Sequence, residues 1–129
     1  MDDEGGMLFF GKRQSRDRLL IADLINSASG RPVYASLFSK VLFEEATGVN
    51  ITDDPVADCP DGGICFIENI SLMPILDRIG EIVIYRWNRL YPSDKKIDIE
   101  PRDLGFRLKE SYDFVGTSHN KITKEVYER

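Results

Sequence analysis

Apolar residues in the first third of the chain recur at the spacing of an α-helix. Two pairs lie four residues apart: Leu20 with Leu24, and Ile21 with Ile25. Ser15 is a suitable N-cap for this run, and Gly30 is a suitable stop. The pattern predicts a helix over residues 16–29.

The same four-residue spacing continues after Pro32, a residue that suits the first turn of a helix. Two adjacent rows of apolar side chains follow: Val33, Leu37 and Val41 in one, and Tyr34, Phe38 and Leu42 in the other. The pattern predicts a second helix that ends at Gly48. Residues 49–62 contain prolines, glycine and four aspartates, and this composition indicates a loop.

The second half of the chain carries mainly strand signals. Residues 82–87 are β-branched or aromatic almost throughout, and they form the strongest strand signal of the sequence. Three further elements are predicted: a strand over 64–70, a short helix over 72–79, and a strand over 95–99 that pairs antiparallel with 82–87. The alternation of apolar and other residues over 104–109 favours another strand, although Pro101 followed by Asp103 could instead start a helix. A final helix is predicted after Thr117 or Ser118, which serves as its cap, with Ile122 and Val126 facing inward.

This order of elements predicts an α+β fold, in which helices pack on a mainly antiparallel sheet of about four strands. The 129 residues are 42% hydrophobic, which is enough for one core, so we expect a single domain over residues 1–129. Residues 1–6 are polar and contain glycine, and this indicates a flexible tail.

Several protein classes do not fit the sequence. Its apolar runs are much shorter than the roughly 20 residues that span a bilayer, so we expect no membrane segment. No basic and apolar leader opens the chain, so we predict a cytoplasmic protein in which Cys59 and Cys65 are thiols rather than a disulfide. The cysteine spacing and the single histidine do not fit a zinc site, and no glycine motif for a cofactor occurs. We therefore expect neither a metal nor a cofactor.

Negative charge is concentrated in the middle of the chain. The net charge is −5, and no Lys or Arg occurs between Lys40 and Arg78, an interval with eight Asp and Glu residues. This balance disfavours direct binding of nucleic acid. Six acidic residues form the candidate binding surface: Glu44, Glu45, Asp53, Asp54, Asp58 and Asp61. The leading hypothesis is that they dock on a basic protein, as in an inhibitor, an immunity-type protein or an accessory protein. An ordinary solvated loop, or a divalent cation site of unusual spacing, are the alternatives for these residues.

The only histidine, His119, supports an alternative of another class, because histidine is the commonest general acid or base near neutral pH. In this alternative a small enzyme acts on a phosphorylated metabolite or RNA. The phosphate would be bound by one or more of three basic residues: Arg86, Arg89 or Lys121. A Ser118–His119 pair is implausible on the predicted helix, since adjacent helical residues do not face each other. A helix cap explains the segment more simply, and the sequence as a whole favours a binding protein over an enzyme.

Overall fold

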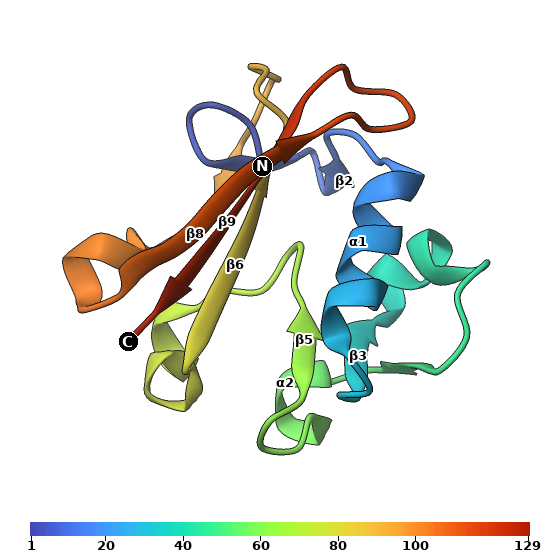
Figure 1. Cartoon of the computed structure of the whole chain (residues 1–129), viewed down its shortest axis with the longest axis vertical. Helices are drawn as coiled ribbons and strands as arrows, with labels where there is room; N and C mark the ends of the chain where they lie inside the picture. Colours follow the sequence, from blue (N-terminus) through green and yellow to red (C-terminus); the bar gives the residue numbers. More distant parts are fainter. The chain divides into compact units, whose positions relative to one another are not determined.

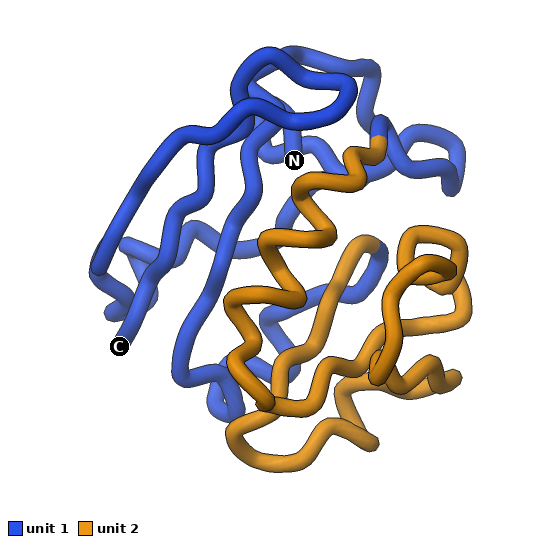
Figure 2. The backbone as a smooth tube through the Cα atoms, turned by 45° about the vertical axis from the view of Figure 1, so that its right-hand side comes forward, with its two compact units in different colours: residues 1–15, 69–129 blue, residues 16–68 orange.

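The computed structural model describes all 129 residues, and the chain divides into two compact units (Figure 2). Unit 1 comprises Met1–Ser15 and Asn69–Arg129, and unit 2 comprises Arg16–Glu68. Each unit is described by itself below. No helix of the structure has the length and apolar character needed to cross a membrane.

Unit 2 is built on a parallel three-stranded sheet in the order β4-β3-β5. Its strands are β3 (Val33–Ser36), β4 (Val49–Thr52) and β5 (Ile64–Phe66). Leu24 of the first helix, Ala35 of β3 and Phe43 form the buried cluster of this unit. Parallel strands need crossover connections, and the segments between these strands supply them.

Three helical segments belong to unit 2: α1 (Arg18–Ala28), the 3₁₀ helix η1 (Leu37–Phe43) and the one-turn α2 (Pro55–Asp58). The helix predicted over 16–29 is confirmed as α1, although its N-cap is Asp17 rather than Ser15. The second helix, predicted to begin after Pro32 and end at Gly48, is wrong in its first part, which forms strand β3. The segment 49–62, predicted to be a loop, contains β4 and α2. The predicted strand over 64–70 is shorter than expected, since β5 ends at Phe66.

The larger sheet of unit 1 is antiparallel, with strand order β6-β9-β8 (Figure 1). Its strands are β6 (Glu81–Arg86), β8 (Arg107–Phe114) and β9 (Ile122–Glu128). One face of this sheet packs into a core formed by Ile82, Ile84, Ile99, Phe106 and Tyr127. Two 3₁₀ helices, η2 (Met73–Arg78) and η3 (Pro101–Leu104), lie in the connections of this unit.

A second, small sheet in unit 1 has the order β2-β1-β7. Its strands are β1 (Gly6–Phe9), β2 (Lys12–Arg13) and β7 (Lys95–Lys96). The sequence predicted that residues 95–99 pair with the strand over 82–87. In the structure, strand β7 pairs with β1 instead. Close to β1, within the segment 1–6, the side chain of Asp2 is fully buried.

The predicted fold class is therefore wrong in its central feature. The structure has three small sheets of three strands each, one of them parallel, in place of one mainly antiparallel sheet of about four strands. The predicted final helix is also wrong, because residues Ile122–Glu128 form strand β9. Ile122 and Val126 are buried as expected, since four residues apart is also an even spacing and places both on one face of a strand.

Candidate functional site

His119 lies in the loop between β8 and β9 of unit 1, and only 5% of its surface is exposed. Its ring stacks on the indole of Trp87, with ring centroids 4.3 Å apart and an angle of 19° between the planes. The residue is therefore not the exposed first-turn side chain of a helix that the sequence suggested. It is a buried ring in a fixed orientation.

Three hydroxyl groups surround the two ring nitrogens of His119. Nε2 lies 3.0 Å from Ser15 Oγ and 3.2 Å from Tyr91 Oη, and Nδ1 lies 3.2 Å from Ser118 Oγ. In the tautomer whose Nδ1–H donates to Ser118, Nε2 carries a lone pair and can accept a hydrogen bond from Ser15 or Tyr91. Ser118 and His119 are in contact, contrary to the prediction, because this segment is a loop and not a helix.

The buried carboxylate of Asp2 holds the neighbours of this histidine in place. It accepts hydrogen bonds from Gly6 N at 2.7 Å, Glu4 N and Gln14 Nε2 at 2.9 Å, and Tyr91 N at 3.4 Å. Burial raises the pKa of Asp2, but the hydrogen bonds outweigh it, and the net pKa lies below the ordinary value. Asp2 thereby fixes Tyr91 and the residue that precedes Ser15.

Gly6 allows this close approach, because its missing side chain leaves room for the network. A Cβ at position 6 would lie 2.5 Å from Asp2 Oδ2 and 2.7 Å from both Gln14 Nε2 and Ser93 Cβ. Gln14 Oε1 is buried and has no hydrogen-bond partner in the structure. A buried acceptor of this kind is unusual, and here it lies one residue from Ser15.

The three basic residues of the enzyme hypothesis are not gathered around His119. Arg89 is adjacent to the cluster, since its Cζ lies 5.5 Å from the centroid of the Tyr91 ring. Lys121 Nζ lies 3.7 Å from Asp113 Oδ2, on the exposed side of the β8–β9 hairpin. Only Arg89 of the three is placed to assist chemistry at His119.

Arg86 belongs to a different polar group of unit 1. Its Nε donates to Glu125 Oε1 at 2.6 Å, and the hydroxyl of Tyr127 donates to the same oxygen at 3.0 Å. Burial lowers the pKa of Arg86, but the bond and charge of Glu125 raise it to a net value above the ordinary one. Arg86 lines a cavity of about 260 Å³, together with Ile84 and Glu100, and His119 does not reach this cavity.

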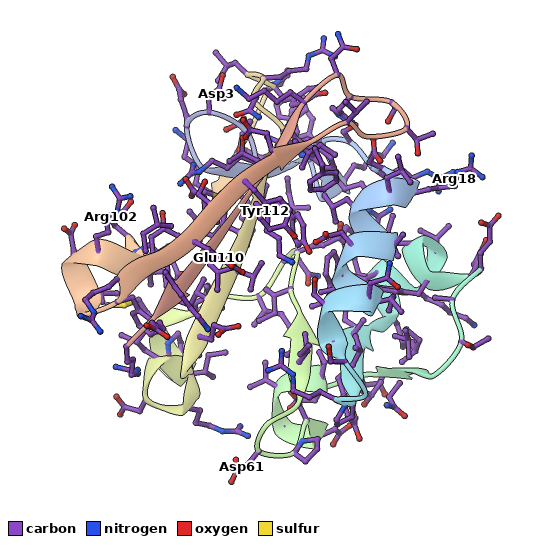
Figure 3. All side chains as sticks on the ribbon, in the orientation of Figure 1. Asp3, Arg18, Asp61, Arg102, Glu110 and Tyr112 are labelled. Carbon is purple, nitrogen blue, oxygen red and sulfur yellow. The ribbon has the colours of Figure 1, made fainter.

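The six residues of the predicted acidic surface all belong to unit 2 and are exposed. Two of them stabilise the local backbone: Asp54 Oδ1 accepts from Ala57 N at 3.1 Å and caps α2, and Asp58 accepts from the hydroxyl of Thr52. Asp61 points away from the rest of the chain at a loop tip (Figure 3). No group of three or more His, Cys, Asp or Glu side chains in the structure could hold a metal ion. Cys59 and Cys65 are half-buried thiols.

The structure concentrates the charge of the chain in one unit. Unit 2 contains nine Asp and Glu residues against four Lys and Arg, whereas unit 1 contains 13 of each. The whole net charge of −5 is therefore carried by unit 2.

Ser15, Tyr91 and Asp2 were not predicted from the sequence as parts of a site. Ser15 and His119 are 104 positions apart, and Tyr91 and His119 are 28 apart, so no local spacing connects them. Asp2 was placed in a flexible tail because of its polar and glycine-containing surroundings. Hydrogen bonds between segments that are distant in the sequence bring these residues together.

No family model and no curated protein matches this chain. Among solved structures, it is similar to dihydrofolate reductase from Enterococcus faecalis, which was solved in complex with NADP(H) and RAB-propyl. The TM-score is 0.64 and the sequence identity is 11%, over 100% of this chain and 92% of that chain. The chain therefore has the α+β fold of a dihydrofolate reductase. An identity this low shows the fold alone.

Proposed function

We propose that this protein is a small hydrolase, in which Ser15 is the nucleophile and His119 is the general base. The observation that carries the proposal is the distance of 3.0 Å between Ser15 Oγ and His119 Nε2. A nucleophile and base within hydrogen-bond distance, with the base oriented by a third group, is the arrangement that activates serine in many enzymes. Ser118, at 3.2 Å from Nδ1, is the orienting group here.

The reaction we propose is hydrolysis of a small ester that carries a negatively charged group. Ser15 Oγ attacks the carbonyl carbon, and its proton moves to His119 Nε2. The ester bond to the leaving alcohol breaks, and His119 returns the proton to that alcohol. Water then attacks the acyl-Ser15 bond, again with its proton passing to His119, and releases the acid and free Ser15.

Two further residues have assigned roles in this proposal. Arg89, beside the Tyr91 ring, is a fixed positive charge suited to a phosphate or carboxylate group of the substrate. Tyr91 Oη competes with Ser15 for Nε2, since a neutral ring nitrogen accepts one proton at a time. Asp2 is a positioning residue, because it holds the segments that carry Ser15 and Tyr91 and does not touch His119.

The fold comparison does not decide the activity, because a likeness at 11% identity shows the fold alone. NADP(H) is a ligand of that reductase, and likeness of fold does not transfer it to this chain. The hydroxyl and imidazole geometry around His119 is independent of the comparison, and it supports hydrolysis rather than hydride transfer.

Diisopropyl fluorophosphate, a small reagent for activated serines, tests the proposal directly. We expect it to phosphorylate Ser15 with loss of fluoride, located by mass spectrometry of peptides. His119→Gln should slow this labelling by about 100-fold or more, which is the contribution of a general base. Tyr91→Phe should keep or increase the rate, because it removes a hydroxyl that competes with Ser15 for Nε2.

Ser111→Ala provides the matched control, since Ser111 is an exposed serine of β8 and has no histidine contact. Its labelling at Ser15 should equal that of the wild type. Hydrogen exchange of β6, β8 and β9 amides checks that each variant is folded. Absence of label on Ser15, or a folded His119→Gln variant that reacts at the wild-type rate, would show that the histidine is only structural.

The concentration of charge in unit 2 favours a second candidate function, docking on a basic protein. In this candidate Glu44, Glu45, Asp53, Asp54, Asp58 and Asp61 contact Lys and Arg of the partner. Next to them in the chain, η1 exposes Leu37 and Val41, with 58% and 39% of their surfaces accessible. An apolar centre with a charged rim is the usual composition of a docking surface.

Charge reversal separates docking from general electrostatic attraction. We expect the quadruple change of Asp53, Asp54, Asp58 and Asp61 to Lys to abolish capture of a basic protein that the wild type retains and releases at high salt. The control carries the same change of charge in unit 1, at four exposed residues: Asp3, Asp77, Glu81 and Asp103. Equal capture by both variants in a pull-down would contradict docking through unit 2.

A further inference from the structure

The two cysteines of the chain lie at the two ends of one short loop of unit 2. Cys59 is the C-cap of α2, and Cys65 is the middle residue of β5. The helix and the strand are in contact, and Figure 1 shows them side by side. Both cysteines are half-buried thiols, so neither is sealed in the core of the unit.

Cys65 points away from the buried cluster of unit 2. Its two neighbours on β5, Ile64 and Phe66, both pack against that cluster. Successive side chains of a strand point to opposite faces of the sheet, so the Cys65 side chain projects from the other face. The thiol of Cys65 is therefore open to a partner on the face that Ile64 and Phe66 leave.

Gly63 places the sulfur of Cys59 against this same face. Ile64 N donates to Pro32 O at 2.8 Å, which continues the parallel ladder between β5 and β3 back towards Gly63. A side chain at position 63 would point to the same face as Cys65, because the two positions are two residues apart. A Cβ built there would lie only 2.6 Å from Cys59 Sγ.

The distance between the two thiols follows from this placement. Positions two apart on a strand are about 6.6 Å from each other. Cys59 Sγ therefore lies within about 9 Å of the Cβ of Cys65. Residues 59–63 belong to no helix or strand, so the loop can bring the two sulfur atoms together without breaking a ladder of backbone hydrogen bonds.

We propose that Cys59 and Cys65 are a site of reversible oxidation, at which a small disulfide such as oxidised glutathione converts them to a disulfide. The thiolate of one cysteine attacks oxidised glutathione, which forms a mixed disulfide and releases one glutathione. The thiolate of the other cysteine attacks the protein sulfur of this mixed disulfide and releases the second glutathione. The protein loses two thiol protons and two electrons, and both pass to the two molecules of reduced glutathione.

The disulfide ties the end of α2 to β5 and encloses Asp61, which is labelled at the tip of the loop in Figure 3. Oxidation thus restrains part of the acidic segment of unit 2, and reduction releases it. The inference is independent of the proposed hydrolase, because neither Ser15 nor His119 takes part in it.

Glutathione redox buffers test the proposal on the full chain, once in the folded state and once in concentrated urea. Alkylation with N-ethylmaleimide, followed by mass spectrometry, counts the thiols that remain at each ratio of reduced to oxidised glutathione. Because the fold holds the two cysteines near each other, we expect the disulfide to be about tenfold more stable in the folded chain than in the unfolded chain. A disulfide that is equally or less stable in the folded chain would overturn the proposal.

Gly63→Ala tests whether the position of the Cys59 sulfur matters. The new Cβ displaces this sulfur, so the folded variant should lose most of the tenfold advantage, while the value in urea stays the same. Gly80→Ala is the matched control, because a Cβ there meets no atom within 4 Å, and it should behave as the wild type. A folded Gly63→Ala variant that keeps the full advantage would show that the thiols do not meet at Gly63, and the proposal would fail.

Discussion

Asp2→Asn is expected to lower the free energy of unfolding by about 3 kcal/mol at pH 7. The carboxylate of Asp2 receives four hydrogen bonds and is fully buried. An amide offers one oxygen and an NH₂ group, so at least one buried donor, such as Gln14 Nε2, would face another donor. Leaving a buried donor unsatisfied costs about 1–3 kcal/mol, and the bonds to a charged acceptor are lost in addition.

The cost of Asp2→Asn should depend on pH in a defined direction. The pKa of Asp2 is lower in the folded chain than its ordinary value of 3.8, so the carboxylate stabilises the fold above that value. This stabilisation is lost as the pH falls through the lowered pKa. The difference between wild type and variant should therefore be largest near pH 7 and smaller near pH 3.

Urea unfolding at both pH values measures this difference. Asp3→Asn is the matched control, because it removes the same charge from the adjacent, exposed residue. It should change stability by about 0.5 kcal/mol or less. An Asp2→Asn variant as stable as Asp3→Asn would show that residues 1–6 are the flexible tail that the sequence suggests.

The sequence predicts an element correctly where the spacing of its apolar residues fits only one kind of secondary structure. Strand β6 was predicted correctly, because a continuous β-branched and aromatic run suits no other element. Helix α1 was also predicted correctly, because two pairs of apolar residues four apart and the glycine that follows them all indicate a helix in the same place. Both wrong helices relied on residues four apart, such as Ile122 and Val126, and this spacing fits a strand as well as a helix.

The candidate site could be predicted only in part. The chemistry of His119 was recognisable from its residue type, but its partners were not, because they come from distant segments of unit 1. The acidic residues were found by composition alone, and the structure adds that all of them lie in unit 2.

Phe43→Ala is expected to destabilise the chain by about 4 kcal/mol, the typical cost of truncating a buried aromatic residue. Phe43 is 4% exposed and makes an edge-to-face contact with Phe66, with ring centroids 5.2 Å apart. It packs in the cluster of unit 2 with Leu24 and Ala35. Phe43→Leu, which keeps most of the volume, should cost much less and serves as the control.

The only tryptophan, Trp87, reports on unit 1, whereas Phe43 lies in unit 2. The sequence predicts a single domain over residues 1–129. If that prediction holds, the chain unfolds in one transition and Phe43→Ala should shift the urea midpoint of Trp87 fluorescence by about 2 M. The helical circular dichroism signal should shift equally. Unit 2 has only about 50 residues, a size at which an isolated core is marginal, and this favours shared stability. A Trp87 midpoint that stays in place while the circular dichroism midpoint falls would instead show two domains that unfold independently.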